Sequence, residues 1–351
     1  MNRRDFIRSA ALGTAFVSAR AFAGGGKETG GGLIVPKGEG MHITGTFLDE
    51  ISHDIPHQNW GEKEWDADFA HMKAIGIDTV IMIRCGHRRF ITYPSRYLLS
   101  QGCHMPSVDL VDMFLRLSEK HGMAFYFGLY DPGLKTTDSR LIMDAYSEKN
   151  MYVIEEVWKR YGGYPAFKGW YLSSEFNRLL AGVIPSVRRM GRQCKDCSPG
   201  LKTFISPSVQ GRKALSSYDS AVTRGDGGIT VTRHEKEWYE IFDGIHEVID
   251  ACAFQDGHVD YGELPEFLSV NKRLCDKYEI ESWTNVENFD RDMPIKFLPI
   301  KFDKMRLKLE AAKKAGISKA ITFEFSHFMS PQSMYPSAGN LYNRYREYFG
   351  I

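Results

Sequence analysis

Cysteine is scarce in this chain, and the net charge is close to zero. Six cysteines in 351 residues are too few for the disulfide framework of a small secreted domain. Only Cys194 and Cys197 are closely spaced, as a local disulfide or half of a zinc site requires, and no second CxxC or CxxH motif completes a zinc set. A net charge of +1 provides no electrostatic reason to bind nucleic acid or an anionic membrane surface. The composition, 43% hydrophobic and 25% charged, is that of a soluble globular protein.

The N-terminus lacks an apolar run long enough for a transmembrane helix, because its apolar stretch covers only residues 9–19. This stretch follows the pair Arg3 and Arg4 and precedes an A-x-A cleavage site at residues 21–23. The three signals in this order predict a twin-arginine signal peptide over residues 1–23. We therefore expect the twin-arginine export machinery to carry the folded chain to the periplasm or outside the cell, without stable membrane insertion.

The rest of the chain divides into a Gly-rich tether over residues 24–33 and a folded domain over residues 34–351. Within the domain, short β-forming runs alternate with amphipathic helical patterns eight times. The expected strands are 42–48, 78–83, 123–130, 167–174, 202–206, 250–254, 281–286 and 319–323. The expected helices are 64–75, 108–121, 139–161, 184–192, 237–248, 264–278, 302–315 and 341–348.

This alternation predicts an α/β fold with a parallel sheet. Eight units in a chain of this length favour a single closed (β/α)₈ barrel, the TIM barrel, over an open doubly wound sheet. No Gly-rich phosphate fingerprint follows the first strand, which removes the main signature of a nucleotide-binding open sheet. We expect no cofactor.

In a (β/α)₈ barrel the functional site lies at the carboxyl ends of the strands. Many polar side chains of this chain fall at those ends, which is a functional-site signal because crowded carboxylates repel each other. Glu175 and Glu287 follow the fourth and seventh expected strands and are the candidate catalytic pair. The candidate substrate-binding residues are Glu50, Arg84, Tyr130, Asp131, Gln255, Asp256, Asn285, Glu324, His327 and the loop aromatic Trp60.

Two carboxylates that face each other across a cleft are what cleavage of a glycosidic bond requires. One must be protonated to donate a proton to the leaving oxygen, and the other must stay ionised. A carboxyl separation of about 5 Å would indicate retention of configuration, and about 6.5–9.5 Å inversion. An aromatic content of 13% also suits a site that stacks on sugar rings, although a large aromatic core explains it equally well.

Several segments of the chain resemble the family called domain of unknown function 4434. They are Ile43-Thr-Gly-Thr-Phe47, the helix–strand junction from Trp65 to Asp78, Gly169-Trp-Tyr-Leu172 with Glu175, Phe254-Gln-Asp-Gly257 and the run from Phe323 to Pro331. More broadly, the chain is similar to (β/α)₈ glycoside hydrolases with catalytic glutamates after strands four and seven. This resemblance implies that Glu175 is the acid/base and Glu287 the nucleophile, acting on an oligo- or polysaccharide. The chain departs from that pattern at Ser174, where an Asn usually precedes the acid/base, and at Glu324, where an aromatic residue usually ends strand eight.

Two other interpretations use the same acids. Glu175, Asp256, Glu287 and Glu324, together with a loop histidine, are also suitable ligands for Mg²⁺ or Mn²⁺ in a sugar isomerase or epimerase. Against that alternative, no expected strand ends on a histidine. The third interpretation is a barrel that binds carbohydrate without catalysis, because a fold can persist when its chemistry is lost.

Overall fold

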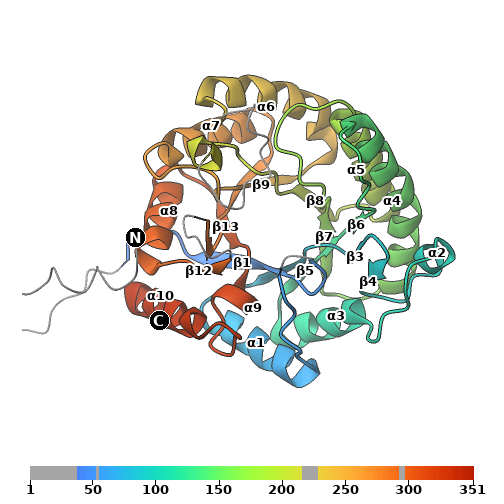
Figure 1. Ribbon diagram of the computed structural model, residues 1–351, viewed down its shortest axis with the longest axis horizontal. Coiled ribbons are helices and arrows are strands. Elements are labelled where there is room, and N and C mark those ends of the chain that lie inside the picture. Colours follow the sequence, from blue (N-terminus) through green and yellow to red (C-terminus); the bar gives the residue numbers. More distant parts are fainter. Residues whose placement is uncertain (1–37, 53–54, 216–227, 292–296) are drawn as a thin grey trace, which may run out of the picture. The chain divides into compact units, whose positions relative to one another are not determined.

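The computed structural model describes residues 38–52, 55–215, 228–291 and 297–351. The predicted signal peptide and tether lie outside these ranges. Eight parallel strands form a closed barrel in the order β1-β13-β10-β9-β8-β7-β5-β2 (Figure 1). Their bounds are β1 Ile43–Leu48, β2 Thr79–Met82, β5 Ala124–Gly128, β7 Phe167–Tyr171, β8 Lys202–Ile205, β9 Ala251–Gln255, β10 Glu281–Asn285 and β13 Lys319–Thr322. The prediction of a single (β/α)₈ barrel is confirmed.

Helices surround the barrel on the outside (Figure 1). The main ones are α1 Glu62–Ala74, α3 Leu110–His121, α4 Ser139–Tyr161, α5 Val183–Cys197, α6 Val231–Ile245, α7 Leu264–Lys277, α8 Phe302–Lys314 and α10 Pro336–Phe349. Among the described residues, no helix combines the length and apolar character needed to cross a bilayer.

Short elements follow several barrel strands at their carboxyl ends. They are β3 Gly86–His87, β4 Phe90–Ile91, α2 Arg96–Ser100, β6 Tyr130–Asp131, the 3₁₀ turn Arg212–Leu215, β11 Phe289–Asp290, β12 Leu298–Pro299 and α9 Phe325–Phe328. A separate 3₁₀ turn, His246–Val248, lies between α6 and β9 and is not one of them. Strands β4, β3 and β6 form a small sheet, and β11 pairs with β12. These elements thicken the carboxyl end of the barrel, so they bury the polar side chains that follow its strands.

The start of α6 differs from the sequence prediction, which placed it at residue 237. The helix begins at Val231, because the side chain of Thr230 caps it by accepting a hydrogen bond from the backbone N–H of Arg233. The sequence of the first turns of α6 is mostly polar. His234 in these turns is nevertheless buried, and its Nε2 lies 2.6 Å from the amide oxygen of Asn271 on α7. A tertiary contact therefore explains why the apolar periodicity missed these turns.

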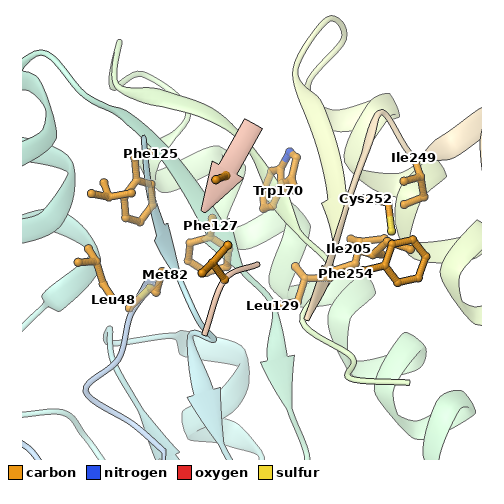
Figure 2. Close-up of a cluster of buried hydrophobic side chains, with 14 of the residues drawn as sticks. Leu48, Met82, Phe125, Phe127, Leu129, Trp170, Ile205, Ile249, Cys252 and Phe254 are labelled. Atoms are coloured by element: carbon orange, nitrogen blue, oxygen red, sulfur yellow. The ribbon is translucent and has the colours of Figure 1, made fainter. Parts of the chain in front are cut away.

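Alternating side chains along the strands divide the core in two. Inside the barrel lie residues such as Phe47, Tyr126 and Phe204, in one cluster with Tyr171 and Trp283. Their neighbours in sequence point outward and pack beneath the helices, as Figure 2 shows for Leu48, Phe125, Phe127, Trp170 and Ile205. Because successive strand residues face opposite sides, a strand of a parallel barrel must be apolar on both faces.

All six cysteines carry free thiols. Cys194 and Cys197 lie on one face of α5, where Cys194 is buried and Cys197 is partly exposed. The structure therefore contradicts the alternative of a local disulfide between these two residues.

Candidate active site

A pocket of about 160 Å³ opens at the carboxyl end of the barrel. Five predicted site residues line it together, from strands or loops that are far apart in sequence. They are Arg84, Glu175, Gln255, Asn285 and Glu287. The remaining wall is made of Phe47, Ser52, Ile55, Ile83, Phe289, Arg291, Phe297 and Phe323. The two candidate catalytic glutamates thus share one pocket, as their positions after β7 and β10 predicted.

Glu287 lies two residues beyond the end of β10 and its side chain is only 4% exposed. Arg291, four residues further along the chain, binds both carboxylate oxygens of Glu287 at 2.8 and 3.0 Å. Burial alone would raise the pKa of Glu287, but the charges of Arg291, Lys308 and His258 outweigh it and hold the pKa below its ordinary value. Glu287 is therefore an ionised carboxylate at neutral pH.

A buried ion pair holds the backbone of Glu287 in place. Asp256 accepts a hydrogen bond from the backbone N–H of Glu287 at 3.1 Å and lies 2.8 Å from the ammonium group of Lys308. Lys308 also donates to the carbonyl oxygen of Glu287 at 2.9 Å. The carboxylate of Glu287 lies so close to Gly257 that a Cβ at that position would be 1.6 Å from Oε2. Asp256, predicted to bind substrate, instead positions Glu287, so that prediction is corrected.

Glu175 lies four residues beyond the end of β7, and its side chain is 47% exposed. Desolvation by the surrounding residues raises the pKa of Glu175 above its ordinary value. Arg84, which is 3.4 Å away, and Arg291 oppose this rise, whereas Asp131 and Glu287 add to it by repulsion. Because the carboxyl group is half-exposed, water moderates the effect.

Arg84 is held beside Glu175 by a series of adjacent ion pairs. Arg84 also contacts Asp131 at 3.3 Å, and Asp131 lies 2.9 Å from Nδ1 of His87 on β3. Asp131 does not line the first pocket, but it lines a second one that shares Arg84 and Glu175 with the first. The predicted residues Arg84 and Asp131 therefore lie next to the candidate acid.

Gln255 and Asn285 end neighbouring strands, β9 and β10, and are paired in register. The amide group of Gln255 donates to the carbonyl oxygen of Ser206 at 2.7 Å, and that of Asn285 donates to the hydroxyl group of Ser206 at 3.2 Å. These bonds fix both amides on the floor of the pocket beneath the two glutamates.

Glu324 and His327 were predicted to bind substrate, and both are fully buried. The carboxylate of Glu324 caps α9 by accepting hydrogen bonds from the backbone N–H groups of Ser326 and His327, and it lies 2.5 Å from Nδ1 of His327. Burial lowers the pKa of His327, but the charge and hydrogen bond of Glu324 outweigh it and raise the pKa to about 9. The pair stabilises the turn after β13, which corrects the prediction that it binds substrate.

Tyr130, Trp60 and Glu50 also lie outside the pocket lining. The hydroxyl group of Tyr130 donates to the carbonyl oxygen of Arg88, and its ring is buried in the outer core. Trp60 packs edge-on against Trp65 at 5.1 Å, beneath its loop. Glu50 is half-buried near the mouth, and burial raises its pKa to about 7. Tyr130 and Trp60 thus make packing contacts, and their contact with substrate stays a prediction.

Sequence reasoning missed Arg291 and an aromatic wall. The guanidinium group of Arg291 lies 4.6 Å from the ring centroid of Phe289, and Phe289 packs edge-on against Phe297 at 4.8 Å. Phe47 and Phe323 continue this wall at 5.8 Å from each other. Residues 287–291 are not helical and include β11, so the four-residue spacing of Glu287 and Arg291 was no sequence signal for this ion pair.

The residues proposed as metal ligands in the isomerase alternative are each engaged with a cation. Glu175 pairs with Arg84, Asp256 with Lys308, Glu287 with Arg291 and Glu324 with His327. Within the described ranges, no group of three His, Cys, Asp or Glu side chains is arranged to hold a metal ion. In the part of the chain that the structure describes, these four acids are thus paired with cations rather than gathered around one point.

A model of the family described as Domain of unknown function (DUF4434) matches residues 43–335. The chain belongs to this family. A solved structure described as a proposed alpha-L-fucosidase from Bacteroides thetaiotaomicron VPI-5482 is 67% identical to this DUF4434 chain, with a TM-score of 0.86 over 91% of this chain and 99% of that one. An endo-1,4-beta-D-mannanase from Thermotoga petrophila RKU-1 shares the fold at 11% identity and a TM-score of 0.54, over 88% of this chain and 99% of that one. No curated protein matches the sequence.

Proposed function

We propose that this DUF4434 barrel is a glycoside hydrolase, with Glu175 as the general acid and Glu287 as the nucleophile or general base. The observation that carries the proposal is that the two glutamates line one pocket in different surroundings. Arg291 binds both carboxylate oxygens of Glu287, whereas Glu175 is half-exposed beside Arg84, and the pKa directions of the two carboxyl groups, raised for Glu175 and lowered for Glu287, agree with this difference. Pairs of carboxyl groups whose surroundings separate their pKa values are typical of glycosidase acid and base roles.

In the proposed reaction, the protonated Glu175 donates its proton to the glycosidic oxygen as the bond from that oxygen to the anomeric carbon breaks. The ionised Glu287 either attacks the anomeric carbon or removes a proton from an attacking water molecule. If Glu287 attacks, the deprotonated Glu175 then removes a proton from water, whose hydroxyl group displaces Glu287 from the anomeric carbon. If Glu287 acts as the base, the hydroxyl group of water bonds to the anomeric carbon directly, the proton on Glu287 passes to solvent and Glu175 regains a proton from solvent. Asp256 and Lys308 position Glu287 for this role through its backbone.

The first sugar to test is an α-L-fucoside. A solved protein with 67% identity over 91% of this chain is described as a proposed alpha-L-fucosidase, and at that identity the pocket walls are expected to be closely similar. We therefore extend the proposal to α-L-fucosides as the substrate class.

We also propose that the protein is exported through the twin-arginine pathway into the periplasm or the medium. The sequence signals in residues 1–23 support this proposal.

The test is hydrolysis of a panel of aryl glycosides and oligosaccharides, α-L-fucosides included, with EDTA present. Glu287→Gln should abolish cleavage. Glu281→Gln is the matched control, because Glu281 begins the same strand and is 43% exposed at the opposite end of the barrel. EDTA-resistant cleavage that survives Glu281→Gln and is lost in Glu287→Gln supports the proposal.

Cleavage that EDTA alone removes would instead indicate metal-dependent chemistry. Sugar binding that Glu287→Gln leaves intact, without turnover of any substrate by the wild type, would indicate a carbohydrate-binding barrel. Either result contradicts the proposal.

A further inference from the structure

A second pocket, of about 270 Å³, adjoins the first one. The two pockets share Arg84 and Glu175, but Glu287 and Arg291 line only the first. Glu175 therefore stands between them, with its carboxyl group accessible to both sides. This asymmetry distinguishes the side of the candidate acid from the side of the candidate nucleophile.

Apolar side chains supply most of the exposed surface of the second pocket. It lies between α4, the loop after β7 and the start of α5, which pack side by side (Figure 1). Its apolar lining consists of Ile142, Met143, Tyr146, Phe176, Leu180 and Val183. Its polar lining consists of Arg84, Asp131, Ser139, Ser173, Ser174 and Glu175. The first pocket also has apolar walls, but it presents two glutamates, two arginines and two amides.

Several polar atoms of this lining form hydrogen bonds within the protein. The hydroxyl group of Tyr146 lies 2.7 Å from the hydroxyl group of Ser173, which in turn donates to the carbonyl oxygen of Leu129 at 2.8 Å. The hydroxyl group of Ser174 donates to the sulfur atom of Met143 at 3.4 Å. Phe176 is held by stacking on Trp238, with ring centroids 5.7 Å apart. The pocket thus has a fixed wall that offers mostly apolar surface.

We propose that this second pocket is the leaving-group subsite and that it selects glycosides whose leaving group presents an apolar surface. The inference rests on the proposed function. A general acid must lie beside the oxygen that joins the two halves of the substrate. If the cleaved sugar occupies the first pocket, which contains both glutamates, the leaving group extends past Glu175 into the second pocket, which contains Glu175 but not Glu287. An apolar leaving group gains affinity there because it removes apolar surface from water.

Binding tests this inference without any need for turnover. Octyl and methyl 1-thio-α-L-fucoside, which resist hydrolysis, are titrated by calorimetry into the wild type, Leu180→Asn and Leu307→Asn. Leu180 lines the second pocket and is 39% exposed, whereas Leu307 is 45% exposed on α8 and serves as the matched control. Ile142→Asn is a second variant in the same pocket.

We expect the wild type to bind the octyl compound at least about tenfold more tightly than the methyl compound. Leu180→Asn and Ile142→Asn should each reduce this ratio roughly fivefold, and Leu307→Asn should leave it unchanged. Equal binding of the two compounds, no binding of either, or a ratio that Leu180→Asn does not change would overturn the inference.

Kinetics separate this inference from the proposed function. For an octyl fucoside, Leu180→Asn should lower kcat/KM roughly fivefold, whereas for fucosyl fluoride, whose leaving group is too small to reach the pocket, kcat/KM should not change. If the wild type cleaves neither compound but binds the octyl thiofucoside more tightly than the methyl one, the result contradicts the proposed hydrolase activity and not the apolar pocket. If the wild type cleaves both substrates and Leu180→Asn lowers kcat/KM equally for the two, the result contradicts the leaving-group subsite and not the hydrolase activity.

Discussion

The two ends of the barrel carry the same kinds of charged pairs in opposite surroundings. At the amino end, Lys319 lies 2.8 Å from Asp78, whose side chain is 60% exposed, and Lys202 pairs with Glu281. At the carboxyl end, Lys308 lies 2.8 Å from Asp256, and both side chains are at most 3% exposed. The distance is the same, so burial is what separates the two pairs.

This difference explains why the chemistry is expected at one end only. Exposed ion pairs are screened by water and contribute little. Buried ones interact strongly and shift each other's pKa values. The short elements after the strands cover the carboxyl end, so that the carboxyl groups of Glu175 and Glu287 acquire different proton affinities. Four predictions test this comparison.

The largest expected effect is that of Glu175→Gln on turnover. Loss of the general acid should lower kcat/KM by about 10²–10⁴-fold for substrates with a poor leaving group, such as an alkyl alcohol. For a leaving group that departs without protonation, such as 2,4-dinitrophenolate, the loss should be much smaller. Steady-state kinetics on the two substrates measure the contrast. An equal loss on both would show that Glu175 is not the acid.

A buried carboxylate that loses its cationic partner should destabilise the fold. Lys308→Met leaves Asp256 buried and unpaired, at a cost of about 3–5 kcal/mol in the free energy of unfolding. Urea denaturation measures this change. The double variant Asp256→Asn with Lys308→Met should recover part of the loss, because it removes the uncompensated charge. A single variant as stable as the wild type would contradict the account.

The pair His327 and Glu324 should make stability depend on pH. The pKa of His327 is about 9 in the folded chain and 6.5 when unperturbed, so the folded state binds the proton more tightly. The resulting stability is fully present below about pH 6.5 and is lost as pH rises through about 9, by at most about 3 kcal/mol. Thermal unfolding across this range should show the decline, and His327→Gln should flatten it.

The same measurement separates His327 from Asp68. Burial raises the pKa of Asp68 to about 7, so its contribution is present at low pH and is lost between about pH 4 and pH 7. A decline above pH 7 that persists in His327→Gln would contradict the assignment to His327.

The smallest effect is expected at the amino end. Lys319→Met removes the exposed pair with Asp78 and should change the free energy of unfolding by less than about 1 kcal/mol, with kcat/KM unchanged. Urea denaturation and steady-state kinetics on this variant measure both quantities. A loss as large as that of Lys308→Met would show that burial does not distinguish the two ends.

Local periodicity was enough to predict most of the fold. The helix expected over residues 139–161 is α4 Ser139–Tyr161, and the strand expected over 202–206 is β8 Lys202–Ile205. Such patterns can be read from sequence because each element has one face, or both, committed to the core. They also placed Glu175 and Glu287 after the correct strands, since the carboxyl end of each strand is known once the barrel is recognised.

The sequence by itself therefore determined the (β/α)₈ architecture and the two glutamates that follow β7 and β10. Only the tertiary structure decided which of the other acids face the pocket. Glu324 also follows a strand, but α9 begins directly after it and turns its carboxylate into a buried helix cap. Asp256 meets Lys308 from a helix 52 residues further along the chain. Strand position sets where a side chain starts, whereas long-range partners set where it points, and such partners leave no local pattern in the sequence.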